Sequence, residues 1–96
     1  MICKKSWVRG RVQGVFYRAT TASRARELGV QGYARNLMDG RVEVVAYGNA
    51  EAVQALIDWL WIGSSGSKVT AVETVEIDLE AAQFPDGHFP DGFDTF

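Results

Sequence analysis

Residues 7–28 read WVRGRVQGVFYRATTASRAREL, and within this stretch the pattern changes from that of a strand to that of a helix. Residues 7–12 alternate modestly between apolar and polar side chains, which is typical of a strand. From 18 to 29 the apolar side chains recur instead at helical spacing and share one face. The stretch therefore predicts a strand, a short loop over 13–17 and a helix that ends at a glycine.

A hairpin and a second helix are predicted next. Residues 31–37 and 41–47 have the character of strands, and the Asp-Gly pair at 39–40 is a strong signal for a hairpin turn between them. Asn49 is a good N-cap residue for an amphipathic helix over 50–62.

The last predicted elements are a long strand over 68–79, after a Gly/Ser-rich break, and a short strand over 93–96. The order β-α-β-β-α-β predicts a ferredoxin-like α+β sandwich of the split βαβ type, with an antiparallel sheet and two helices packed on one face. We expect residues 1–96 to form a single domain, because a chain of this length supplies one modest core. This fold serves many functions and does not decide among them.

The composition excludes several classes of protein. The chain is 47% hydrophobic and 23% charged, which is typical of a globular domain. No apolar run approaches the ~20 residues of a membrane span, and none follows residues 1–5 as in a signal peptide. Cys3 is the only cysteine, so no internal disulfide can form. We therefore expect a cytoplasmic protein without a membrane partner.

The charge is divided unevenly along the chain. Residues 1–41 hold nine of the ten Lys and Arg residues and only Glu27 and Asp39 as acids, which gives a net charge of +7, whereas residues 42–96 have a net charge of −9. A basic N-terminal half suits an anionic ligand. The structural alternative is a dipolar surface that aids solubility.

The loop before the first helix could hold such an anion. The first amides of a helix lack internal partners and carry the positive end of the helix dipole, so they favour an oxyanion. Gly14 allows the backbone to approach a ligand, and Arg18 offers a planar fork of donors. The amides of Val15, Phe16 and Tyr17 could complete a nest around the anion. The loop lacks the Gly-Lys-Ser/Thr of a nucleotide-binding P-loop, and a purely structural turn remains the alternative.

Two motifs resemble the signatures of the acylphosphatase family. Residues 10–18, GRVQGVFYR, resemble Gly-x-Val-Gln-Gly-Val-x-Phe-Arg. Residues 32–36, GYARN, followed by GRV at 40–42 and by Gly48, resemble the second signature. The similarity covers roughly residues 3–80 and weakens over the tail. It implies the family's ferredoxin-like fold and the hydrolysis of acyl phosphates to a carboxylate and inorganic phosphate.

The resemblance also implies roles for individual residues. Arg18 binds the substrate phosphate, the amides of residues 14–18 cradle the same group, and Asn36 positions the nucleophilic water. No metal ion or organic cofactor is implied, and we expect a monomer that binds no nucleic acid. Without the resemblance, Asn36 beside a hairpin would be interpreted as a turn residue. Arg18 has an independent physical case, because it lies at a loop-to-helix junction.

These residue types suit the chemistry. The leaving group of an acyl phosphate is a carboxylate whose acid has a pKa near ~4, so it needs no general acid at neutral pH. The reaction needs charge stabilisation on the phosphoryl oxygens and an aligned water. An asparagine amide can accept a hydrogen bond from that water. Its proton would pass to a phosphate oxygen, as in the substrate-assisted route proposed for the family.

The sequence departs from the family pattern at three places. Tyr17 replaces the usual Phe, and its hydroxyl requires a partner. Ser64 stands where the family often has Pro, which we expect to loosen that loop without touching the site. The acidic tail from Glu80 leaves the pairing of the last strand open. His88, in a Pro/Gly-rich part of this tail, is expected to be an ordinary loop residue.

Two other functions are compatible with the same topology. One is a module that binds phosphate or an acyl phosphate without turnover. The other is an RNA-binding domain, against which stand the absence of the expected aromatic RNA-contact motif and a pI near 5.3.

Overall fold

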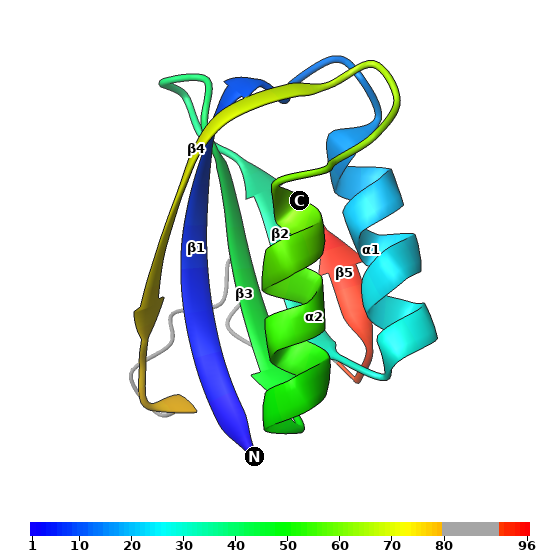
Figure 1. Cartoon of the computed structure of the whole chain (residues 1–96), viewed down its shortest axis with the longest axis vertical. Helices are drawn as coiled ribbons and strands as arrows, with labels where there is room; N and C mark the ends of the chain where they lie inside the picture. Colours follow the sequence, from blue (N-terminus) through cyan, green and yellow to red (C-terminus); the bar gives the residue numbers. More distant parts are fainter. Residues whose placement is uncertain (80–90) are drawn as a thin grey trace.

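A computed structural model describes residues 1–79 and 91–96 (Figure 1). The loop assignment of His88 lies outside the described residues. The elements are β1 (Ile2–Arg11), α1 (Tyr17–Leu28), β2 (Gln31–Asn36), β3 (Val42–Gly48), α2 (Ala50–Leu60), β4 (Lys68–Glu76) and β5 (Phe93–Thr95).

The strands form one sheet in the order β4-β1-β3-β2-β5. Both helices cover the same face of this sheet (Figure 1), which confirms the predicted ferredoxin-like α+β fold. The sheet is nevertheless mixed, because β5 pairs in parallel with β2, whereas the sequence predicts an antiparallel sheet. The direction of so short an edge strand depends on which neighbour it joins, and its own residues do not encode that choice.

Most element boundaries lie within two residues of the predicted ones. The main exception is β1, which was predicted to begin at residue 7 and begins at Ile2. Residues Cys3 to Ser6 pair with β3, just as the residues after them do, so they extend the strand. α1 ends at Gly29, whose φ of 72° closes the helix as a left-handed cap. The side chain of Asn49 accepts a hydrogen bond from the amide of Glu51 at 2.9 Å, so the predicted N-cap of α2 is confirmed.

The core lies between the helices and the sheet, with a smaller cluster on the opposite face. α2 contributes large side chains to it, Leu56 and Leu60 among them, whereas α1 contributes mainly small ones such as Ala22 and Ala25. The second cluster is built around Cys3, Tyr33 and Val45.

Helix α1 also holds the edge strand β5 in place. Arg18 Nη1 donates to the main-chain carbonyl of Phe96 at 2.6 Å, and Arg26 Nη2 donates to that of Phe93 at 2.7 Å. The two arginines lie two helical turns apart, so α1 contacts β5 at both ends of the strand. This arrangement brings the last described residues to the start of α1, where the candidate site lies.

Candidate active site

The loop between β1 and α1 presents free backbone donors. Phe16, the N-cap of α1, offers no side-chain hydrogen bond to the first turn, and its own backbone has φ 60° and ψ 21°. The amide of Thr20 is the first in the helix with an acceptor, the carbonyl of Phe16 at 3.0 Å. The amides of residues 17–19 have no hydrogen-bond acceptor within 1–79 and 91–96. Such a helix start favours an anion.

Glycine is required at position 14 by the course of the loop. Gly14 has a φ of 75°, which non-glycine residues rarely adopt, and a Cβ there would meet nothing within 4 Å in the described structure. The backbone is therefore open on this side, so that a ligand can approach it closely.

Gln13 connects the loop to the β2–β3 hairpin. Its Nε2 donates to the carbonyl of Leu37 at 2.8 Å and to that of Arg41 at 3.0 Å. Leu37 directly follows Asn36, so this side chain fixes the distance between the loop and the end of β2. This role was not predicted from the sequence, although Gln13 lies within the first motif.

Tyr17 and Ser64 attach the loop to α2 and the segment after it. The Tyr17 hydroxyl donates to the carbonyl of Leu60 at 2.7 Å, which supplies the partner that this hydroxyl requires. Burial raises the pKa of Tyr17, so the hydroxyl stays protonated and remains a donor. Ser64 Oγ donates to the carbonyl of Val15 at 2.8 Å. The expectation that Ser64 leaves the site untouched was therefore wrong, because the fold places residue 64 beside the loop.

One cavity of about 290 Å³ brings the two motifs together. Val15 is the one predicted phosphate-binding residue whose side chain does not line it, since that side chain lies beside Gly66. Val12, Ala19 and Thr95 were not predicted. Val12 belongs to the first motif, which could have revealed it, whereas Ala19 and Thr95 carry no sequence signal. The lining residues are Val12, Gly14, Phe16, Tyr17, Arg18, Ala19, Asn36 and Thr95.

Arg18 places a positive charge in this cavity. No side-chain carboxylate of the described residues lies within ion-pair distance of its guanidinium. One of its N–H groups is used by Phe96, at 2.6 Å, and the other donors remain available in the described structure. A planar cation with free donors beside unpaired amides is suited to a phosphate group.

Asn36 also lines this cavity, and its side chain holds an unsatisfied acceptor. Its Oδ1 is buried and has no hydrogen-bond partner within the described part of the chain. The backbone N–H of Asn36 donates to the main-chain oxygen of Phe96 at 3.4 Å, so this one oxygen contacts both Asn36 and Arg18. A buried acceptor without a partner is costly unless water or a ligand donates to it.

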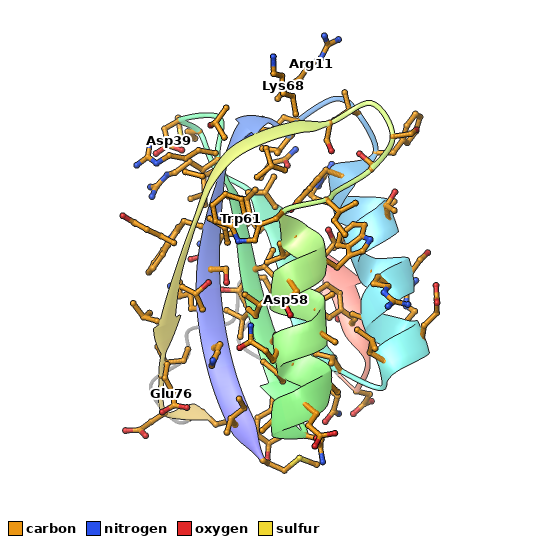
Figure 2. All side chains as sticks on the ribbon, viewed as in Figure 1. Arg11, Asp39, Asp58, Trp61, Lys68 and Glu76 are labelled. Atoms are coloured by element: carbon orange, nitrogen blue, oxygen red, sulfur yellow. The ribbon has the colours of Figure 1, made fainter. Side chains whose placement is uncertain are left out.

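Further positive charge lies at the same end of the molecule. Arg11 and Lys68 are cross-strand partners at the end of β1 and the start of β4, and both point outward there (Figure 2). Both are exposed and form no ion pair with a described carboxylate. The loop begins one residue after Arg11, so this charge raises the potential near the cavity.

Neither a metal cluster nor a spanning helix is found in the described ranges. No group of three His, Cys, Asp or Glu side chains in 1–79 and 91–96 could hold a metal ion. Neither helix described there is long and apolar enough to cross a membrane.

Comparisons with known proteins agree with this geometry. The acylphosphatase family model matches residues 4–90. An acylphosphatase of Hahella chejuensis is 54% identical over 76 residues, which are 79% of this chain and 81% of that protein. The solved acylphosphatase of Coxiella burnetii superposes with a TM-score of 0.85 at 33% identity, over 99% of this chain and 92% of that one. For the acylphosphatase of Bacillus subtilis the TM-score is 0.83 at 32% identity, over 100% and 99% of the two chains. The chain therefore belongs to the acylphosphatase family and is a hydrolase of acyl phosphates.

Proposed function

We propose that Arg18 and the amides of residues 14–18 hold the phosphoryl group of the acyl phosphate while Asn36 positions the attacking water. The observation that carries this assignment is the buried, unpartnered Oδ1 of Asn36 in the cavity that Arg18 also lines. It is an acceptor that a water can satisfy, beside a cation and amides that a phosphate can satisfy.

The reaction follows from these positions. A water that donates one hydrogen to Asn36 Oδ1 directs a lone pair at the phosphorus. As the new P–O bond forms, the bond from phosphorus to the acyl oxygen breaks and the electron pair leaves with the carboxylate. The remaining acidic proton of the water passes to a phosphate oxygen, which completes inorganic phosphate. Arg18 and the loop amides stabilise the charge on the phosphoryl oxygens throughout.

The cavity wall lacks the groups of a general acid–base mechanism. None of the described residues that line it carries a carboxylate, an imidazole or a thiol. A carboxylate leaving group does not need protonation near neutral pH, since the pKa of its acid is ~4. We therefore propose a mechanism in which positioning and charge stabilisation supply the rate enhancement, without a metal ion or an organic cofactor.

The test is hydrolysis of benzoyl phosphate, with and without a chelator, by the wild type and two variants. Arg18→Gln should raise the inhibition constant of inorganic phosphate and reduce kcat/KM at least about 100-fold, the usual cost of removing one donor to a transition-state oxyanion. Asn36→Ala should reduce kcat about 100-fold and change the phosphate inhibition constant less than about threefold.

Arg24→Gln is the matched control, because Arg24 lies on the same helix and pairs with Glu27 at 3.1 Å. It should leave all constants unchanged. Near-full activity of Asn36→Ala would refute the water-positioning role. A folded wild-type protein that binds phosphate without turnover would point instead to a binding module, and activity lost on chelation would refute the metal-free mechanism.

We further propose that residues 1–96 act as one domain and as a monomer in the cytoplasm. Cys3 is a buried free thiol, which suits a reducing compartment. Sedimentation of the purified protein would test the monomer, and cell fractionation would test the cytoplasmic location.

A further inference from the structure

The side chain of Phe16 is exposed in the wall of the catalytic cavity. Phe16 lines the cavity and is 82% exposed, whereas the neighbouring lining residues Val12 and Tyr17 are both 1% exposed. An exposed aromatic side chain gains nothing from the core, so its position calls for another explanation.

The backbone holds this ring outside the core at a cost. Phe16 is the one described residue other than glycine with a positive φ, a conformation that is unfavourable for a side chain with a Cβ. Its neighbours are fixed on both sides, by Ser64 at the carbonyl of Val15 and by Leu60 at the hydroxyl of Tyr17. Between these two attachments the backbone of Phe16 has a defined position at the cavity wall.

The acyl group of the substrate must leave the cavity on the side away from Asn36. In phosphoryl transfer the attacking and leaving oxygens lie in line on opposite sides of phosphorus, so a water at Asn36 directs the acyl group outward. Among the described lining residues Phe16 is an exposed aromatic one, and Arg18 and the buried Tyr17 are the ones with ionisable side chains. Apolar contact is therefore the recognition that the wall can supply to the acyl group.

We infer that Phe16 is a specificity-determining residue that favours acyl phosphates with an apolar or aromatic acyl group over small ones. The inference rests on the proposed function, since it takes the phosphate to lie at the loop and the water at Asn36. The ring packs against the acyl group and shields the scissile bond from bulk water on that side.

The experiment compares benzoyl phosphate with acetyl phosphate, whose acyl group is too small to cover the ring. Phe16→Asn removes the ring and keeps a residue that tolerates a positive φ. It should reduce kcat/KM for benzoyl phosphate about fivefold, the effect of losing one aromatic contact. The loss for acetyl phosphate should be smaller, so that the preference for benzoyl phosphate falls, and the inhibition constant of inorganic phosphate, which has no acyl group, reports any change in the cradle separately.

Two further variants complete the design. Phe16→Tyr keeps the ring and should retain the wild-type preference between the substrates. Met38→Ala removes an equally exposed apolar side chain that does not line the cavity, and it should change neither substrate.

Three results would overturn the inference: equal losses of kcat/KM for both substrates, no loss for either, or a loss accompanied by a higher inhibition constant of inorganic phosphate. In each case the ring would act on the cradle or not at all. Failure of the proposed function is distinguishable from these results. In that case Arg18→Gln or Asn36→Ala would keep near-full activity on both acyl phosphates, whatever Phe16→Asn does.

Discussion

The hydroxyl of Tyr17, which the usual Phe of the family motif lacks, forms an additional hydrogen bond in this fold. Its ring is buried where the motif has Phe, and its additional hydroxyl donates to the carbonyl of Leu60. Leu60 is the last residue of α2, and carbonyls at helix ends lack intrahelical partners. The hydroxyl thus satisfies a carbonyl that is otherwise left without a helical donor, and it joins the two helices next to the site.

Replacing Tyr17 by Phe should therefore affect stability and leave catalysis intact. We expect Tyr17→Phe to lower the free energy of unfolding by about 1 kcal/mol, the usual net contribution of one hydrogen bond. The change in kcat/KM for benzoyl phosphate should stay within about twofold, since the amide of residue 17 is retained. Urea denaturation followed by tryptophan fluorescence measures the first quantity, and an unchanged midpoint would show that the hydrogen bond contributes nothing.

At the scale of elements, the loop between β1 and α1 is held by two segments that are distant from it in sequence. Gln13 attaches it to the β2–β3 hairpin, and Ser64 attaches it to the segment between α2 and β4. Ser64 is itself held in a tight turn, in which Ser67 Oγ donates to its carbonyl at 2.7 Å. The loop is thereby supported from both sides before any ligand arrives, which reduces the ordering cost of binding.

Removing the Ser64 hydroxyl tests this support. Ser64→Ala should raise the inhibition constant of inorganic phosphate about threefold and lower the free energy of unfolding by about 1 kcal/mol, because Val15 loses a donor in a partly buried place. Ser65→Ala is the matched control, since Ser65 is adjacent and exposed. Equal effects of the two substitutions would show that the Ser64 contact does not support the loop.

At the scale of the whole molecule, one carboxylate connects three strands on the face of the sheet opposite the helices. The carboxylate of Glu43, in β3, forms ion pairs with Lys5 of β1 at 2.8 Å and with Arg35 of β2 at 2.6 Å. The Tyr33 hydroxyl donates a hydrogen bond to it at 3.2 Å. Burial raises the pKa of the Glu43 carboxyl, but the hydrogen bonds and charges of Lys5 and Arg35 outweigh burial and hold the pKa below its ordinary value of 4.5.

This cluster should make the fold sensitive to acid. The unfolded carboxyl takes up its proton at a higher pH than the folded one, so its stabilisation is present above about pH 4.5 and is lost as the pH falls through the folded pKa. Glu43→Gln should lower the free energy of unfolding at pH 7 by about 1–2 kcal/mol, between the values for exposed and buried pairs.

The free energy of unfolding of Glu43→Gln should depend less on pH between 5 and about 3 than that of the wild type. Urea denaturation across that range measures it. Glu73→Gln, at an exposed position of β4, is the control. An acid dependence of Glu43→Gln equal to that of the wild type would contradict the role of the cluster.

The sequence by itself determined the local elements and the family. Strand alternation, the helical face of α1, the Asp-Gly turn and the Asn49 cap are encoded by residues close together in the chain, so they could be predicted without the structure. The loop motif with Arg18 has a local physical rationale, whereas the importance of Asn36 followed only from the resemblance of the second motif.

Only the tertiary structure decided how these parts meet. It brings Arg18, Asn36 and the carbonyl of Phe96 together, although these residues are far apart in sequence. It also decided the parallel pairing of β5 and the contact of Ser64 with the loop, which the sequence predictions had missed or misjudged. The physical reason is that periodicity and capping depend on neighbouring residues, whereas such contacts depend on how the finished helices and strands pack against one another.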